Sequence, residues 1–197
     1  MTVERIDFFF SYRSPYSYLA APRAFALADR FTVDVVYRGV LPMAMRGQAV
    51  PRAKRLHTVR DVAREAKRLG MPFGRMYDPI GDGAWRCLLV GEYALDVGRE
   101  RQFVLESSRG IWSEAIDVAD DRGLRTVCER AGLGWPECSA ALGDSTLRAR
   151  VEANTTALVD LGHWGVPVLR LGDELFWGQD RIEDVERSLL AAGLGRA

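Results

Sequence analysis

Residues 7–20 read D-F-F-F-S-Y-R-S-P-Y-S-Y-L-A, and the rest of the chain can be arranged around this stretch. The apolar run 6–10 is too short to span a membrane and is bounded by polar residues, which is typical of a buried strand. Ser14 and Pro15 then indicate a helix start, because serine suits the N-cap and proline suits the first helical position. Backbone N–H groups and the positive end of the helix dipole converge at Ser14, so the sequence predicts either an anion site or a plain helix cap.

The composition is that of an ordinary globular protein, and it restricts the class of partner. The chain has 197 residues, of which 48% are hydrophobic and 27% are charged. Its 27 basic residues balance 27 acidic residues, unlike the basic surface of a nucleic-acid-binding protein. No apolar run approaches the ~20 residues of a membrane helix, and the first residues do not read as a signal peptide. We therefore expect a cytoplasmic protein of one domain, with no nucleic-acid or membrane partner.

The cysteines indicate neither a disulfide framework nor a metal site. Cys87, Cys128 and Cys138 are odd in number and form no Cys-x-x-Cys pair. Cys87 and Cys128 fall within helical patterns and are expected to be small core residues. A reducing compartment fits this usage, and we expect no bound metal.

Hydrophobic periodicity places strands at the two ends of the chain and helices between them. Strand patterns cover 6–10, 32–38, 166–171 and 174–177, and the last two flank a Gly172-Asp173 turn that predicts an antiparallel hairpin. Helical spacing predicts helices at 15–29, 59–69, 85–97, 99–116, 123–131, 145–161 and from 181 onward. The first two strands, separated by a helix, favour a parallel pair. Asn154 is the polar member of an apolar stripe, where we expect a hydrogen-bonded buried amide.

Pro167 stands at the start of a predicted strand, directly after Gly165 and Val166. Proline removes a ladder donor, which is tolerated at strand starts and edges. In thioredoxin-like folds a cis-proline at this place faces the strand–helix junction, and the residue before it offers its backbone N–H and C=O to a bound peptide. We therefore expect a cis Val166–Pro167 bond close to Ser14.

Two end motifs carry a family resemblance: F-F-F-S-Y-R-S-P-Y-S-Y-L-A at 8–20 and W-G-V-P-V-L-R-L-G-D-E-L-F-W-G-Q-D-R at 164–181. The chain resembles the 2-hydroxychromene-2-carboxylate isomerases and kappa-class glutathione transferases, a branch of the thioredoxin-like superfamily related to DsbA-type oxidoreductases. Lys54 followed by Asp61, and I-W-S-E at 111–114, match the family more weakly. The resemblance implies an α/β, thioredoxin-like fold (β-α-β…β-β-α) formed by 1–38 and 163–197. Residues 39–162 would be an inserted all-helical subdomain within one structural unit.

The resemblance also implies a glutathione site. Residues 14–17, read S-P-Y-S, occupy the positions of the Cys-x-x-Cys pair, so Ser14 would donate a hydrogen bond to the cofactor's sulfur and stabilise its thiolate. The other residues implied to bind the tripeptide are Val166 before Pro167 for the cysteinyl backbone, Gln179 and Asp180 for the γ-glutamyl group, and Lys54 for the glycyl carboxylate.

Each of these residues also has a simpler interpretation. Asp180 with Glu183 has the spacing of a helix-capping pair, Lys54 can be a solvated charge, and Trp177 can be a core residue. The chain departs from the family at two positions. An acidic residue is frequent in the family where this chain has Ser11, and a tyrosine is frequent where it has His57. The loops 39–57 and 71–85 also diverge, and such loops shape the pocket of the second substrate.

Three functional hypotheses follow. In the first, the chain is a glutathione-dependent isomerase of aromatic catabolism that acts on a small aromatic or unsaturated acid and forms a homodimer, as the resemblance implies. In the second, the same thiolate serves a transferase or peroxidase. In the third, the chain is a non-catalytic thioredoxin-like module that binds a peptide or small acid. Dithiol exchange is excluded because Ser14 and Ser17 cannot form a disulfide.

Overall fold

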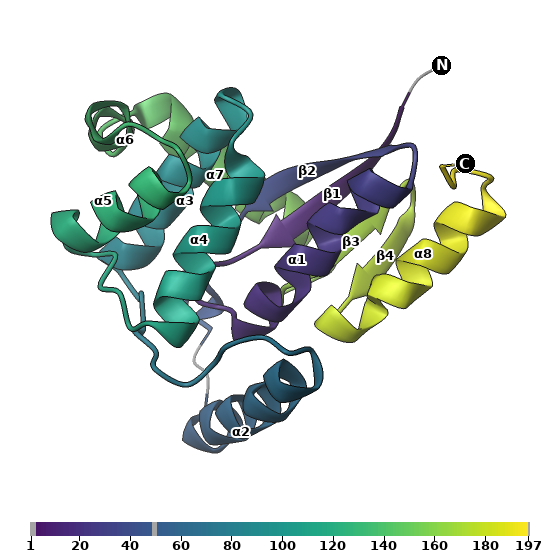
Figure 1. Ribbon diagram of the computed structural model, residues 1–197, viewed down its shortest axis with the longest axis horizontal. Helices are drawn as coiled ribbons and strands as arrows, with labels where there is room; N and C mark the ends of the chain where they lie inside the picture. Colours follow the sequence, from purple (N-terminus) through teal and green to yellow (C-terminus); the bar gives the residue numbers. More distant parts are fainter. Residues whose placement is uncertain (1–2, 49–50, 197) are drawn as a thin grey trace.

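The chain folds around one mixed sheet (Figure 1). The computed structural model describes residues 3–48 and 51–196. The strands are β1 (Glu4–Phe10), β2 (Val33–Gly39), β3 (Val168–Leu171) and β4 (Glu174–Trp177), in the order β2-β1-β3-β4. β1 and β2 are parallel, whereas β3 is antiparallel to both β1 and β4. The predicted thioredoxin-like α/β fold, in which the two ends of the chain share a sheet, is confirmed.

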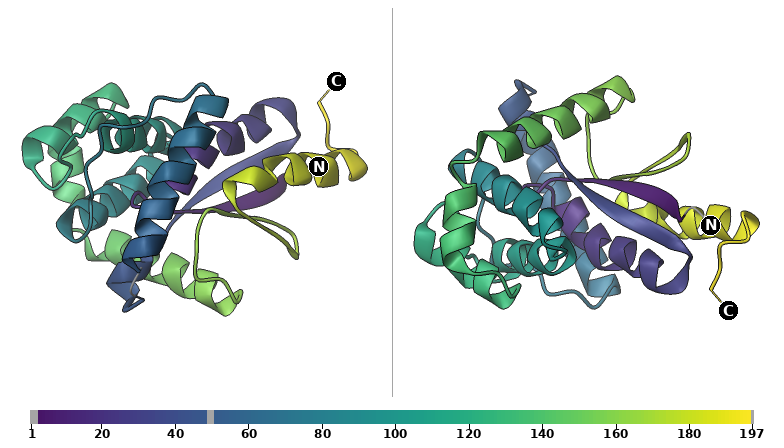
Figure 2. Two further views of the ribbon diagram at one scale, coloured as in Figure 1. Left: turned by 90° about the horizontal axis from the view of Figure 1, so that it is seen from below. Right: turned by 90° about the horizontal axis from the view of Figure 1, so that it is seen from above.

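Helices cover both faces of this sheet. α1 (Pro15–Arg30) follows β1 directly and packs beside α8 (Ile182–Ala191) over one face, while α7 (Ser145–Asp160) packs along β2 on the opposite side (Figure 2). An edge-to-face contact between the rings of Phe8 and Phe25, 5.7 Å apart, joins β1 to α1. The short connection 11–14 leaves the sheet at the ends of β1 and β2, and α2 packs against α1, which follows this connection.

The segment between β2 and β3 contains only helices and loops in the part that the structure describes. It comprises η1 (Met43–Arg46), α2 (Arg52–Arg68), α3 (Asp82–Asp96), α4 (Glu100–Ser113), α5 (Asp121–Arg130), α6 (Trp135–Ala141) and α7. The predicted helical block is thus present, with two differences. α2 begins at Arg52, well before the first apolar residue of its stripe, and the seven-residue α6 was missed because it is too short for a periodic pattern.

The helical block and the sheet share one hydrophobic core. The ring of Tyr12 lies 5.0 Å from that of Phe10 at the end of β1 and 6.0 Å from that of Phe103 on α4. All three side chains are fully buried. This packing fits one structural unit, and the boundaries of the predicted segments 1–38, 39–162 and 163–197 stay a prediction. Residues 1–2, 49–50 and 197 of those segments lie outside the described residues.

Within residues 3–48 and 51–196, no helix has both the length and the apolar character to cross a bilayer. The predicted character of several internal residues is confirmed. Cys87 and Cys128 are buried, as is Cys138. Asn154 is buried and donates a 2.9 Å hydrogen bond from Nδ2 to Oε1 of Glu92.

Candidate active site

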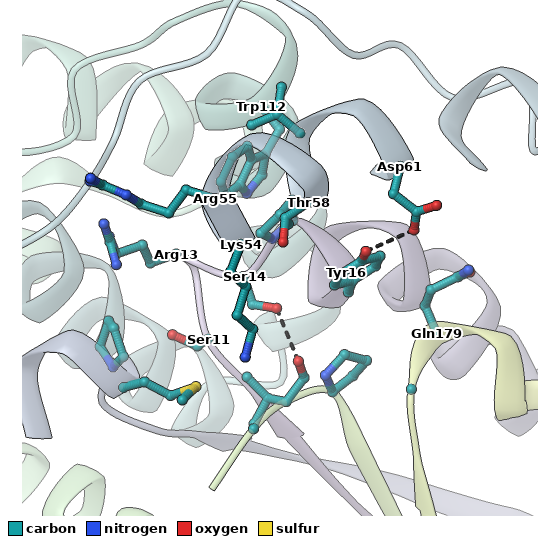
Figure 3. Close-up of a pocket in the computed structure, with 18 of the residues that line it drawn as sticks. Ser11, Arg13, Ser14, Tyr16, Lys54, Arg55, Thr58, Asp61, Trp112 and Gln179 are labelled. Carbon is teal, nitrogen blue, oxygen red and sulfur yellow. Dashed lines mark hydrogen bonds between the residues drawn. The ribbon is translucent and has the colours of Figure 1, made fainter. Parts of the chain in front are cut away.

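A cavity of about 980 Å³ opens where the 11–14 connection, the start of α1, helix α2 and residues 164–181 meet (Figure 3). The six residues that the sequence predicted for the site all line this cavity: Ser14, Lys54, Val166, Pro167, Gln179 and Asp180. They come from opposite ends of the chain and from the inserted helices. The fold therefore brings the predicted residues together around one space.

Ser14 connects the first helix to the segment before β3. Its Oγ accepts a hydrogen bond from the N–H of Ser17 at 3.1 Å, as an N-cap does, and donates one to the carbonyl oxygen of Val166 at 3.1 Å. The Val166–Pro167 bond is cis, as predicted. The cap interpretation of Ser14 is thus correct, and the same hydroxyl also faces the cavity and the cis-proline.

Two backbone amides beside Ser14 are available to a ligand. Pro15 has no N–H and the amide of Ser17 is capped, so the N–H of Tyr16 is the remaining donor of the first helical turn among the described residues. The N–H of Val166 likewise has no acceptor within the described chain. These two donors and the positive end of α1 suit an anion or a peptide backbone.

Gln179 is the most deeply buried member of a partly buried network. It is 6% exposed, and Nη2 of Arg23 donates to its backbone oxygen at 2.7 Å and to its Oε1 at 2.5 Å. Its Nε2 donates in turn to Oε2 of Glu65 on α2 at 3.1 Å. Burial lowers the pKa of the Arg23 guanidinium. The side chain of Gln179 therefore anchors the turn η2 (Gln179–Arg181), and its backbone N–H stays available to a ligand.

Asp180 is more accessible than Gln179. Its carboxylate is 56% exposed and lies 3.3 Å from Nη2 of Arg181. Neither η2 nor α8 has a side-chain cap, so the alternative in which Asp180 and Glu183 form a capping pair is wrong. Asp180 thus presents a negative charge at the rim of the cavity.

Lys54 projects from the first turns of α2 into the cavity (Figure 3). Within α2, the carboxylates of Asp61 and Glu65 form ion pairs with Arg64 and Arg68. Among the described residues, Lys54 forms no ion pair with a carboxylate. Its charge can therefore bind an acidic group of a ligand.

Further polar residues of the cavity walls could not be found from sequence. Arg13 makes a bidentate ion pair with Asp78, in which its Nε and Nη2 lie 2.6 and 2.8 Å from the two carboxylate oxygens. Burial alone would raise the pKa of Asp78, but the hydrogen bonds and charge of Arg13 lower it overall. Tyr16 donates a 2.7 Å hydrogen bond to Asp61, which lowers the pKa of that carboxyl. These contacts hold α2 and the 71–81 loop beside the junction.

Two tryptophans lie at the cavity's edge. Trp164 and Trp177 are each 46% exposed, and their ring centroids are 5.2 Å apart. Trp177 is therefore not the core residue that one interpretation expected. Among the described residues, no group of three or more His, Cys, Asp and Glu side chains is placed to hold a metal ion.

Comparisons with known proteins agree with this architecture. Residues 5–190 match the DSBA-like thioredoxin domain family. A 2-hydroxychromene-2-carboxylate isomerase of Sphingobium xenophagum is 27% identical over 195 residues, which cover 94% of this chain and 97% of that protein.

Solved structures give the same fold. A 2-hydroxychromene-2-carboxylate isomerase superposes with a TM-score of 0.81 at 24% identity, covering 95% of each chain. The cytosolic disulfide reductase DsbM from Pseudomonas aeruginosa with GSH superposes with a TM-score of 0.72 at 19% identity, covering 95% of this chain and 99% of that one.

Proposed function

The chain belongs to the DSBA-like thioredoxin domain family, and we propose that it is a glutathione-dependent isomerase of the 2-hydroxychromene-2-carboxylate type. The observation that carries the proposal is the Ser14–Val166 hydrogen bond, which joins a serine helix cap to the cis-proline segment inside a cavity that holds all six expected residues. The isomerase named among the relatives, alike over nearly its whole length, supports the choice of reaction.

Dithiol chemistry does not fit this site. Positions 14 and 17 are serines, so the first turn of α1 carries no thiol. Cys87, Cys128 and Cys138 are buried and do not line the cavity. A thiol that reacts in this cavity must therefore arrive with a ligand, which supports a glutathione-dependent reaction over disulfide exchange.

The donor set suits glutathione along its length. Lys54 would bind the glycyl carboxylate, the backbone of Val166 before Pro167 would bind the cysteinyl unit, and Asp180 would accept from the γ-glutamyl ammonium. The backbone N–H of Gln179 would serve the γ-glutamyl carboxylate, while its side chain holds the turn in place.

Ser14 would control the protonation of the bound thiol. Its hydroxyl has one proton, which the Val166 carbonyl accepts, so donation to a sulfur requires the hydroxyl to rotate toward the cavity. A hydroxyl donor, the N–H of Tyr16 and the positive end of α1 all favour thiolate over thiol. When bound, glutathione supplies a thiolate that adds to an unsaturated carbon conjugated with a carbonyl, which allows rotation before the thiolate leaves again.

We further propose a cytoplasmic protein, because glutathione and three unpaired thiols both suit a reducing compartment. The resemblance implies a homodimer, and light scattering of the purified chain would test this by measuring its molar mass in solution.

The test is turnover of 2-hydroxychromene-2-carboxylate, followed by absorbance, with glutathione far below the substrate concentration. An isomerase regenerates glutathione, so many turnovers per glutathione and no loss of titratable thiol are expected. Consumption of one thiol per product would instead indicate a transferase, and consumption of two thiols per peroxide reduced would indicate a peroxidase. Turnover that needs no glutathione, or calorimetry without glutathione binding, would contradict the proposal.

A further inference from the structure

Two buried side-chain atoms of cavity-lining residues have no hydrogen-bond partner in the described chain. Oγ of Ser11 belongs to a residue that is 2% exposed and lines the cavity, yet it forms no hydrogen bond. Nη1 of Arg46, which also lines the cavity, is buried and unpaired in the same way. An unpaired buried donor is costly, so two of them at one cavity indicate groups that a ligand satisfies.

Both residues are held in place by the backbone around them. The carbonyl of Ser11 accepts from the N–H of Ser14 at 2.9 Å, which fixes the connection. Nε of Arg46 donates to the carbonyl of Leu41 at 3.1 Å, and its Nη2 donates to the carbonyl of Trp164. Two of the three nitrogens of the Arg46 guanidinium thus donate to backbone carbonyls of the cavity wall, and the third, Nη1, is left to donate to another acceptor.

The topology places these two residues at the same edge of the sheet. Ser11 directly follows β1, and Leu41, to which Arg46 bonds, lies just after the parallel strand β2. The hydrogen bond from Val40 N–H to the carbonyl of Phe10 continues the pairing to this edge. In Figure 3 the Ser11 hydroxyl points away from the hydroxyl of Ser14 and its bond to Val166. Ser11 therefore faces a different part of the cavity.

The charge of Arg46 is not balanced by the protein. Within residues 3–48 and 51–196 no carboxylate forms an ion pair with it, whereas Arg13 on the same cavity is paired with Asp78. The cavity-lining residues that precede Arg46 in sequence, Leu41, Pro42 and Met43, are apolar, while the charged residues Arg13, Lys54, Arg55 and Asp78 line the same cavity. A permanent cation and a hydroxyl donor beside an apolar stretch of wall suit an anionic oxygen group on an apolar body.

We infer that Ser11 and Arg46 form an acceptor subsite that binds the carboxylate of the second substrate, an aromatic or unsaturated acid. Both atoms, Oγ of Ser11 and Nη1 of Arg46, are covered in the described structure, so a side-chain rotation accompanies binding: Ser11 then donates a hydrogen bond to one carboxylate oxygen, and Arg46 supplies the counter-charge and a second hydrogen bond. Neither residue belongs to the set that we propose for glutathione. The inference rests on the proposed function for the view that this cavity is an active site.

The chain offers a matched control for Ser11. Ser108 on α4 is also fully buried with an unpaired Oγ, but it does not line the cavity. Ser11→Ala and Ser108→Ala therefore remove the same group from equally buried positions. Only the first removes it from the cavity.

The experiment measures calorimetric binding of chromone-2-carboxylate, an unreactive aromatic acid, and of neutral chromone. Ser11→Ala should weaken binding of the acid about ten- to a hundredfold, the usual loss for a hydrogen bond to a charged group. Arg46→Lys, which keeps the charge but loses the planar fork, should weaken it as well. Ser108→Ala should match the unmodified chain. Binding of neutral chromone and of glutathione should change less than threefold in every variant.

The inference is wrong if the unmodified chain does not bind the acid, or if Ser11→Ala and Ser108→Ala behave alike. It is also wrong if both cavity variants weaken glutathione instead, since Ser11 and Arg46 would then belong to the glutathione site. Its failure is distinguishable from that of the proposed function. Acid binding that depends on Ser11 in a chain without glutathione-dependent turnover would leave the inference standing and overturn only the function.

Discussion

Two partly buried polar networks of this chain have similar chemistry but different positions relative to the cavity. The first, here called the turn network, joins Arg23 on α1, Glu65 on α2 and Gln179 on η2. The second, the block network, joins Arg38 on β2, Glu92 on α3 and Asn154 on α7.

The difference lies in what each network holds. The turn network connects three elements that all line the cavity, and it fixes the turn that presents Asp180. The block network connects the inserted helices to the sheet, and none of its members lines the cavity. A buried polar group therefore indicates a functional role here only when its network ends at the cavity. Changes in the two networks should separate stability from glutathione binding.

The largest effect is expected in the block network as a function of pH. Burial, partly offset by Arg150, raises the pKa of Glu92 from 4.5 to about 7. The folded state therefore holds this proton more tightly than the unfolded state. Stability from this group is fully present below pH ~4.5 and is lost as the pH rises through ~7, on the order of 3 kcal/mol in all.

Glu92→Gln keeps an acceptor for Asn154 and removes the ionisable group. It should flatten the dependence of unfolding free energy on pH between ~4.5 and ~7 and leave glutathione affinity unchanged. Urea denaturation at several pH values measures the first effect, and calorimetry measures the second. The same slope in both proteins over this pH window would show that Glu92 is not the group responsible.

In the turn network, Arg23→Ala should reduce both stability and glutathione affinity. The change leaves two oxygens of Gln179 without their charged donor, at a cost of roughly 1.5–3 kcal/mol of unfolding free energy. Arg38→Ala is the matched change in the block network, where Arg38 donates to Asp7 and Asn154. It should lower stability alone. Equal effects of both variants on glutathione binding would remove the distinction between the networks.

Asp180→Ala should weaken glutathione binding with little change in stability. Its carboxylate is half exposed, so the protein loses little, whereas a charge-assisted contact to the ligand is worth about ten- to a hundredfold in affinity. Asp173→Ala in the exposed hairpin turn serves as the control. Normal binding by the Asp180 variant would show that this rim charge does not contact the ligand.

Tyr16→Phe is expected to have the smallest effect. It removes one hydrogen bond to the Asp61 carboxylate that joins α1 to α2. Because solvent screens this partly exposed carboxylate, the bond is worth about 1 kcal/mol of unfolding free energy. Glutathione affinity should change less than threefold, since the backbone N–H of Tyr16 remains. A larger loss of affinity than of stability would place the phenol itself in contact with the ligand.

The two ends of the chain could be predicted because their signals are local. A Ser-Pro helix start, a Gly-Asp hairpin turn and short β-branched runs each specify structure within a few residues, and the resemblance placed them on one sheet. The match of residues 5–190 to the DSBA-like thioredoxin domain family confirms the DsbA-related, thioredoxin-like part of the resemblance.

The cavity walls could not be predicted because their contacts are distant in sequence. Arg23 and Gln179 are 156 residues apart, and Arg13 and Asp78 are 65 apart. In the sequence an arginine on a helix reads as a solvated charge, and only the fold shows that Arg23 is paired inside. The exposure of Trp177 and the presence of the short helix α6 were not predicted for a different reason, which is that neither has a periodic pattern.

The central claim, that Ser14 stabilises a bound thiolate, is tested most directly by the pKa of bound glutathione, followed by thiolate absorbance. Ser14→Ala should raise this pKa by about one to two units, while total glutathione binding changes little. Loss of the helix cap should also cost about 1 kcal/mol of stability, so melting is measured in parallel. Ser17→Ala, another buried hydroxyl of α1 that does not line the cavity, should leave the bound-thiol pKa unchanged. A lower melting temperature in Ser14→Ala with an unaltered bound-thiol pKa and unaltered turnover would show that Ser14 is a helix cap alone, and would contradict the mechanism.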